Sequence, residues 1–180
     1  MLNHKGTNQM KTERLTLRPL TENDAPAYFS KLVNDKEVLR YTAWPYHNDI
    51  EKTKEMLAAW TKHYVKPMFY NWAVDLDGTL IGNFTVYRIY EDECALEIGY
   101  CFGKEHWNKG YATEAAKAVI EYLTKEVHAK KIIVSFAAKN PASGKVAQKC
   151  GMQYVKTEAG AFTTREGDVV DVHEYELIVE

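Results

Sequence analysis

The feature that most constrains the fold of this chain is an amphipathic helix between two apolar segments. Apolar residues recur every three or four positions from Tyr111 to Val127, a pattern typical of a helix with one buried face. Residues 94–102 before this helix and 131–137 after it are short and mainly apolar, as strands are. A strand, a helix and a second strand in this order predict a crossover in which the two strands run parallel in one sheet.

The turn that leads into this helix has a chemical use. Residues 107–114 read Trp-Asn-Lys-Gly-Tyr-Ala-Thr-Glu, with Gly110 directly before the helix. The first N–H groups of a helix have no internal partner and lie at the positive end of its dipole, so they bind phosphate or another anion. Gly110 lets the backbone approach such an anion closely, and a plain turn glycine is the alternative interpretation.

The other periodic segments predict a mostly antiparallel sheet with helices packed on it. Alternating or apolar runs indicate five more strands, at residues 15–20, 71–75, 79–89, 152–158 and 169–179. Asp77-Gly78 between two of these runs is a strong hairpin signal. The sequence therefore predicts one α/β (α+β) domain with a mixed sheet of about six to seven strands.

Helix signals complete this prediction. We expect a helix from Asp24, with Asp24 as its N-cap because Pro26 then falls in the first turn, where a missing N–H does no harm. A second helix is expected from Asn48 or Asp49 to about residue 64, and a short one over residues 143–150. Residues 37–44 are ambiguous.

Three segments, in this order, resemble the motifs of one enzyme family. They are Glu-Ile-Gly-Tyr-Cys-Phe at 97–102, Trp-Asn-Lys-Gly-Tyr-Ala-Thr-Glu-Ala at 107–115, and Asn-Pro-Ala-Ser-Gly-Lys-Val-Ala-Gln-Lys-Cys-Gly-Met at 140–152. Together they resemble the GNAT acyl-CoA N-acyltransferases, in particular the branch with the ribosomal-protein N-terminal (alanine) acetyltransferases. The resemblance implies a GNAT-like acetyltransferase domain over residues 12–180, preceded by a flexible N-terminal lead-in over residues 1–11.

The resemblance implies an acetyl-CoA-dependent N-acetyltransferase whose acceptor is a primary amine: a protein N-terminus, a peptide or a small amine. The thioester supplies the reactive acyl group, so the amine attacks it directly in a ternary complex and no enzyme nucleophile is required. The family assigns the end of the first motif to the pantetheine arm of the cofactor and the glycine turn to its pyrophosphate. The cofactor-binding residues implied in this way are Tyr100, Cys101, Phe102, Asn108, Lys109, Gly110, Tyr111, Ala112, Thr113 and Asn140.

The turn and the third motif contain one departure from the usual family pattern and two residues with alternative roles. The family usually begins the turn with Gln or Arg. This chain has Trp107 at that place, as the ribosomal-protein branch has. Lys109 adds a charge near the phosphates or is simply a solvated turn lysine. Asn140 bonds the pantetheine arm in relatives, but an N-cap or Asx-turn before Pro141 is also plausible.

Two residues are the candidate catalytic groups. Strand alternation places Glu97 on one face with Gly99 and Cys101, and a carboxylate in an apolar strand is costly if it is buried without a partner. We expect Glu97 to be the base that deprotonates the amine, through a water; a structural ion pair or a solvent-facing glutamate is the alternative. Many relatives protonate the thiolate with a Tyr seven residues after the Asn, where this chain has Ala147. Ser143 is the substitute donor; the alternatives are a first-turn helix serine with no such role, a water, or unassisted release of the thiolate.

The acceptor side is less defined. The aromatic segment 41–46 makes Trp44 and Tyr46 candidates for one wall of an acceptor pocket, or for anchors that hold a loop on the core. Acidic residues at Asp49 and 91–93 suit a cationic acceptor and equally suit a solvated surface.

Composition excludes several classes of protein. The 180 residues carry a net charge of −2 and no run near 18 apolar residues, so we expect no nucleic-acid partner and no membrane span. Three widely spaced cysteines argue for a reducing compartment, and we expect a cytoplasmic location. No His or Cys spacing is that of a zinc site, so no metal is expected. The aromatic-rich surface candidates allow a homodimer.

Two other functions stay open at this point. The absent Tyr favours a noncatalytic acyl-CoA-binding or sensing module. A nucleotide-binding α/β protein is the weaker alternative, because neither G-x-G-x-x-G nor G-x-x-x-x-G-K-[ST] occurs in the chain.

Overall fold

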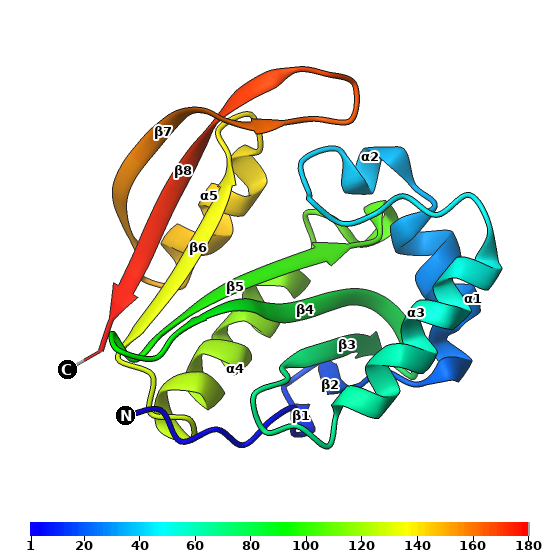
Figure 1. The fold of residues 1–180 in the computed structure, drawn as a ribbon, viewed down its shortest axis with the longest axis horizontal. Helices are drawn as coiled ribbons and strands as arrows, with labels where there is room; N and C mark the ends of the chain where they lie inside the picture. Colours follow the sequence, from blue (N-terminus) through cyan, green and yellow to red (C-terminus); the bar gives the residue numbers. More distant parts are fainter. Residues whose placement is uncertain (180) are drawn as a thin grey trace.

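A twisted sheet of eight strands runs through the computed structural model, which describes residues 1–179 (Figure 1). The strand order is β1-β2-β3-β4-β5-β6-β8-β7, and every neighbouring pair is antiparallel except β5 and β6. The predicted mixed, mostly antiparallel sheet is confirmed, with slightly more strands than the expected six to seven. The strands are β1 (Met10–Lys11), β2 (Leu15–Pro19), β3 (Asn71–Leu76), β4 (Thr79–Tyr90), β5 (Ala95–Phe102), β6 (Lys131–Ala137), β7 (Gln153–Thr163) and β8 (Val169–Ile178).

Helices cover both faces of this sheet and enclose two separate apolar clusters. The larger cluster joins α4 and α5 to one face, through strand residues such as Leu96 and Ile98. The smaller one joins α1, η2, α2 and α3 to the other face, where Cys101 belongs to it. The predicted alternation of β5 side chains between the two faces agrees with these clusters. The helical segments are η1 (Glu22–Asp24), α1 (Ala25–Tyr28), η2 (Phe29–Val33), α2 (Lys36–Leu39), α3 (Ile50–His63), η3 (Lys104–His106), α4 (Tyr111–Lys125) and α5 (Pro141–Lys149).

The predicted crossover is formed by β5, α4 and β6, and its two strands pair over a short distance only. The paired positions are Ala95 with Lys131, Leu96 with Ile132 and Glu97 with Ile133. Beyond Glu97 the two strands no longer pair, while β6 continues beside β8 and β5 beside β4. The C-terminal half of β5 therefore has a free edge toward β6, and backbone groups there are available to a ligand.

The N-terminal segment differs from the expected flexible lead-in. Leu2 is buried in the larger cluster, and the N–H of Asn3 donates to the carbonyl of Val127 at 2.8 Å. The Tyr122 hydroxyl donates to the carbonyl of Gly6 at 2.8 Å. Strand β1, which sequence reasoning did not find, also lies within this segment. The partners Val127 and Tyr122 are more than 100 positions away along the chain, so the polar, aperiodic sequence of residues 1–11 gives no local sign of them.

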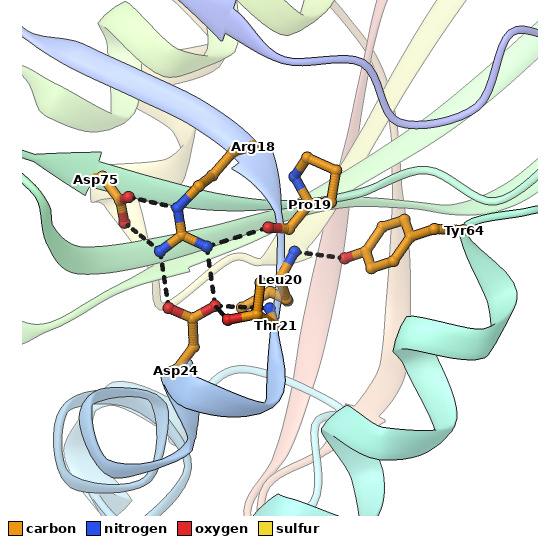
Figure 2. Close-up of polar contacts among 7 residues, drawn as sticks. All are labelled: Arg18, Pro19, Leu20, Thr21, Asp24, Tyr64 and Asp75. Carbon is orange, nitrogen blue, oxygen red and sulfur yellow. Dashed lines mark hydrogen bonds and ion pairs between the residues drawn. The ribbon is translucent and has the colours of Figure 1, made fainter.

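A network around Arg18 ties β2 to β3 and to the first helical turn (Figure 2). The guanidinium donates from Nε to Asp75 Oδ2 at 2.6 Å and from Nη2 to Asp24 Oδ1 at 2.7 Å. The Asp24 carboxylate also accepts from the N–H of Thr21 at 2.7 Å. Asp24 precedes α1 as predicted, but its side chain does not cap that helix, because the carboxylate is engaged by Arg18 and Thr21 instead. Thr21 is the cap residue of η1.

The network gives stability a defined pH dependence. Burial alone raises the pKa of the Asp24 carboxyl, but hydrogen bonds from Arg18 and Thr21 outweigh it, and the net pKa lies below the ordinary 3.8. A carboxyl with a lowered folded-state pKa stabilises the fold at pH values above its unfolded-state pKa. This contribution is lost as the pH falls through the folded-state value.

We expect the Asp24→Asn variant to lose roughly 2 kcal/mol of unfolding free energy at pH 7. This loss is smaller than the loss on breaking a fully buried ion pair, because Arg18 is partly exposed. The difference from wild type should shrink as the pH falls below the ordinary carboxyl pKa of 3.8 and through the lower folded-state pKa, where the wild-type carboxyl becomes protonated too. Urea unfolding at pH 7 and at low pH measures the difference in unfolding free energy between wild type and variant. Glu22→Gln removes an exposed carboxylate two residues away and should change little. An Asp24→Asn deficit that stayed constant with pH would contradict this account.

Candidate active site

The turn before α4 has the conformation that its sequence predicts. Asn108 and Gly110 have positive φ angles of 59° and 84°, and α4 begins at Tyr111. A Cβ added to Gly110 would contact only the Arg14 side chain, at 3.4 Å. Glycine is therefore favoured here by its left-handed backbone and not by a close backbone neighbour. The space in front of the first N–H groups of α4 is part of a cavity.

Arg14, which sequence reasoning missed, braces this turn. Its Nε donates to the Glu114 carboxylate at 2.7 Å, and its Nη1 donates to the carbonyl of Lys109 at 3.2 Å. The guanidinium also lies over the Tyr111 ring, 4.6 Å from its centroid. Glu114 in turn accepts from the Thr12 hydroxyl at 2.6 Å. The start of β2 thus fixes the backbone of the turn and the first helical residues together.

Replacing Arg14 with Ala should weaken acetyl-CoA binding roughly threefold to tenfold, because the turn loses the brace that holds its N–H groups in one arrangement. The rate at saturating acetyl-CoA should change little, since Arg14 contacts the turn and not the reacting atoms. Arg14→Lys should restore only part of the affinity, because an ammonium cannot bond Glu114 and the Lys109 carbonyl in the same planar geometry. Calorimetric titration measures the acetyl-CoA affinity of wild type, Arg14→Ala and Arg14→Lys. Equal affinity in wild type and Arg14→Ala would refute the bracing role.

A cavity of about 550 Å³ lies between the start of α4, the end of β5, the start of α5 and the α2 region. Nine of the ten predicted cofactor residues line it: Tyr100, Cys101, Phe102, Asn108, Gly110, Tyr111, Ala112, Thr113 and Asn140. Lys109 is the one that does not, and its carbonyl is the acceptor for Arg14. Trp107 lines the cavity too, and its Nε1 donates to the carbonyl of Phe102 at 2.7 Å, which joins the turn to the end of β5.

The start of α5 brings the predicted Asn and Ser together. Asn140 Nδ2 donates to the Ser143 Oγ at 3.1 Å, and both residues line the cavity. Asn140 occupies the N-cap position of α5, but its side chain makes no capping bond to the backbone N–H groups of that helix. Lys145 and Lys149, one turn apart on α5, also line the cavity and were not predicted. Their charges suit an anionic ligand.

Glu97 lies where β5 and β6 begin to separate, and it does not line the cavity. The side chain is buried, with 3% of the residue exposed. Its carboxylate accepts hydrogen bonds from the hydroxyls of Tyr87, Tyr90 (3.1 Å) and Ser135 (2.7 Å). The Arg88 guanidinium is 3.7 Å away but largely exposed, which makes it a weak partner. Glu97 is thus a buried carboxylate held mainly by hydroxyl groups.

Tyr87 connects this carboxylate to the surface. It occupies a bulge in β4, where the register with β5 shifts between Val86 and Arg88. Its ring lies across Gly99, where an added Cβ would be only 3.1 Å from it, and about half of the residue is exposed. Burial of the phenol, followed by its hydrogen bond to Glu97, raises the pKa of Tyr87 far above its ordinary value. Tyr87 therefore stays a hydrogen-bond donor to Glu97.

The segment between α2 and α3 borders the cavity, but through other residues than predicted. Tyr41 and Thr42 line it, whereas Trp44 and Tyr46 pack against the smaller apolar cluster. The loop between β7 and β8 meets this segment (Figure 1), where Arg165 Nη1 donates to the carbonyls of Leu39 at 2.9 Å and Thr42 at 3.2 Å. These contacts join distant parts of the chain, so no local pattern announces them.

Three of the four acidic residues considered for a cationic acceptor have structural partners instead. Asp49 caps α3 by accepting from the N–H of Glu51 at 3.0 Å. Glu91 lies 2.6 Å from His4, and Glu93 lies 2.6 Å from Lys131. None of them lines the cavity. They give no reason to prefer a cationic acceptor.

Two further searches concern the part of the chain that the structure describes. No three or more His, Cys, Asp or Glu side chains of residues 1–179 are grouped as a metal site would require. None of the helices within that range has both the length and the apolar character needed to cross a membrane.

The fold is shared with known proteins. Residues 14–153 match the acetyltransferase (GNAT) domain. The chain is 31% identical over 153 residues to the uncharacterized protein YkkB and 30% identical over 146 residues to the uncharacterized N-acetyltransferase YoaA, both of Bacillus subtilis (strain 168). These alignments cover 83% and 80% of this chain, and 87% and 82% of the two relatives. A solved structure of RimL, a ribosomal L7/L12 alpha-N-protein acetyltransferase in complex with coenzyme A, superposes with a TM-score of 0.86 at 19% identity, covering 96% of this chain and 98% of RimL.

The splayed strand pair, the glycine turn and the match to this domain define an acetyltransferase. The chain belongs to the acetyltransferase (GNAT) family. The likeness to RimL, at 19% identity, shows a common fold.

Proposed function

We propose that the chain transfers an acetyl group from acetyl-CoA to a primary amine by direct attack within a ternary complex. One observation carries the proposal: the helix N-terminus, the free edge of β5 and the Asn140–Ser143 pair all face one cavity. Each of the three offers a different kind of group, namely N–H donors for an anion, backbone groups for an extended amide chain, and a hydroxyl. A thioester cofactor with a phosphate end and an amide-containing arm needs all three.

The residues present fit acetyl-CoA. The start of α4 and the turn at Asn108 and Gly110 would hold the pyrophosphate through backbone N–H groups. Lys145 and Lys149 would add positive charge at the phosphate end. The backbone of residues 100–102 and the Asn140 amide would bond the pantetheine arm. When bound, acetyl-CoA supplies the activated acyl group, so the chain needs no nucleophile of its own.

Glu97 is the proposed proton acceptor for the amine. Its buried carboxylate lies where β5 and β6 separate, before the residues at the C-terminal end of β5 that line the cavity. Since it does not line the cavity itself, the amine would lose its proton to Glu97 through a water or through the Tyr87 hydroxyl. In the second route Tyr87 gives its own proton to Glu97 as it takes one from the amine.

Ser143 is the proposed donor toward the departing sulfur. Its hydroxyl lines the cavity, and the Asn140 amide holds the oxygen from one side. A hydroxyl that hydrogen-bonds a thiolate lowers the energy of that leaving group without a full proton transfer.

The acceptor that we propose is the N-terminal amine of a protein or peptide, as in the ribosomal-protein branch that the sequence resembles. The RimL likeness supports this choice at the level of fold. Residues 12–180 would form the catalytic domain. Trp44 and Tyr46 would then support the acceptor side indirectly, by holding the segment that carries Tyr41 and Thr42.

The test is an acceptor comparison. Acetyl-CoA and the protein are incubated with peptides that begin with Ala or Ser, with the same peptides blocked at the N-terminus, and with small amines. Release of free CoA thiol and the mass of the product are followed. We expect thiol release and N-terminal acetylation with the free peptides only. Acetylation of small amines alone would reject the N-terminal acceptor and keep the reaction.

A noncatalytic acyl-CoA-binding module is the second candidate from the sequence. It was motivated by Ala147 at the position of the usual Tyr donor. The Ser143 hydroxyl lines the cavity and is our proposed donor, which weakens that motivation. Acetyl-CoA binding with no acetylation of any amine tested would favour this candidate.

A further inference from the structure

The hydroxyl of Tyr100 is an unexplained polar group at the cavity. Tyr100 lies on β5 and lines the cavity. Its hydroxyl oxygen is inaccessible to solvent and has no hydrogen-bond partner among the described residues. A buried hydroxyl without a partner costs free energy, and native proteins retain few of them. Phe at this position would avoid the cost, so the hydroxyl calls for an explanation.

Packing fixes the position of this phenol. The Tyr100 ring stacks on Phe84 with 5.0 Å between centroids and meets Phe102 edge to face at 6.4 Å. Burial raises the pKa of Tyr100 well above its ordinary value, and the Ser143 hydroxyl, which is near enough to affect it, lowers the pKa only in part. Burial therefore disfavours loss of the phenol proton, and the hydroxyl is available as a hydrogen-bond donor.

The Ser143 hydroxyl is the group to which the Tyr100 hydroxyl would donate. A hydroxyl has one proton to donate and two lone pairs that accept. Asn140 Nδ2 already donates to one lone pair of the Ser143 oxygen, at 3.1 Å. If the Tyr100 hydroxyl donates to the second, both lone pairs are occupied. The Ser143 proton must then point away from these two donors, into the cavity that Tyr100 and Ser143 line.

We propose that Tyr100 is a positioning residue for the acetyl-transfer reaction: its hydroxyl donates to Ser143 when the cavity is filled and so commits the Ser143 proton to the sulfur of the leaving group. The inference rests on the proposed function. No proton leaves Tyr100 in this step. The amine nitrogen bonds to the acyl carbon, the carbon–sulfur bond breaks and its electron pair goes to the sulfur. Ser143 stabilises the resulting thiolate by a hydrogen bond while Tyr100 and Asn140 hold the serine oxygen.

The decisive variant is Tyr100→Phe, which removes the hydroxyl and keeps the stacked ring. Free CoA is the probe, because its bound thiol titrates without any need for turnover, and its thiolate is followed by ultraviolet absorbance. We expect the same affinity for CoA in wild type and variant, but a bound-thiol pKa higher by roughly 0.5–1 unit in the variant. With an accepted amine, kcat should fall about threefold to tenfold.

Further variants separate this role from a structural one. Ser143→Ala should raise the bound-thiol pKa at least as much, and adding Tyr100→Phe to it should change nothing more, because Tyr100 acts through Ser143. Tyr122→Phe, which removes a buried hydroxyl outside the cavity, should leave the thiol pKa at the wild-type value. Unfolding free energy should not fall in Tyr100→Phe, since an unpartnered hydroxyl is lost.

The outcomes are distinct. Folded wild type that binds no CoA would remove the proposed function and this inference together. Bound CoA with the same thiol pKa in wild type and Tyr100→Phe would overturn the inference alone. An effect of Tyr100→Phe that persisted undiminished in the Ser143→Ala background would also overturn it, because the hydroxyl would then act by another route.

Discussion

The Gly110→Trp variant is expected to lose saturable acetyl-CoA binding, with an affinity lower by a factor on the order of 100 or more. Gly110 directly precedes α4 with a φ of 84°, in front of the N–H groups that we assign to the pyrophosphate. A non-glycine residue in this conformation costs about 1–2 kcal/mol, and relief of the strain would turn the N–H groups away. The indole would also occupy part of the cavity. Calorimetric titration measures the loss.

Gly78→Trp is the matched control for this experiment. Gly78 has a similar φ of 78°, in the turn between β3 and β4, and a Cβ added there meets nothing within 4 Å. It does not line the cavity. Both variants should therefore lose a similar amount of unfolding free energy, while only Gly110→Trp loses the ligand. Equal affinities in the two variants would disprove the assignment of the turn.

The second large effect is expected in Glu97→Gln, whose kcat should fall about 100-fold with little change in acetyl-CoA affinity. Glutamine has the same shape; its amide oxygen can accept from the Tyr87 and Ser135 hydroxyls, and its NH2 group can donate to the Tyr90 oxygen, so the fold should be kept. It cannot take a proton from the amine. Because Glu97 does not line the cavity, the cofactor should not sense the change.

The control for Glu97→Gln is Glu91→Gln, the same substitution in the turn between β4 and β5, where Glu91 pairs with His4. Its kcat should equal that of wild type. A second comparison uses Tyr87→Phe, which removes the hydroxyl between Glu97 and the surface. If Glu97→Gln kept the wild-type kcat across the pH range of activity, Glu97 would have no part in the proton transfer.

Much of the fold follows from local sequence. The helix predicted from Tyr111 is α4, and the strands on either side of it pair in parallel. The Asp77-Gly78 turn has two positive φ angles, 51° and 78°, as a tight hairpin turn requires. These elements are encoded by residues close together in the chain, where periodicity and turn chemistry act directly. Nine of the ten predicted cofactor residues line one cavity.

The remainder depends on contacts between distant residues. Arg14 was missed because its partners Glu114 and the Lys109 carbonyl lie about 100 positions away. Asp24 is predicted as a helix cap because its local sequence favours one. In the fold, however, its carboxylate accepts a hydrogen bond from Arg18, which also donates to Asp75. The two acceptor candidates were chosen as aromatic residues on a loop, and the fold turns them toward the core instead. Local preference could not weigh any of these tertiary competitors.

The central claim is that this cavity binds acetyl-CoA, and calorimetric titration of the wild-type protein with acetyl-CoA tests it most directly. Displacement by free CoA and by dephosphorylated pantetheine fragments then shows whether the phosphate end contributes. The account predicts saturable binding at one site per chain, displaced by CoA and much less by fragments that lack the phosphates. A folded protein that gives no saturable heat with acetyl-CoA would contradict the account and every residue role proposed on it.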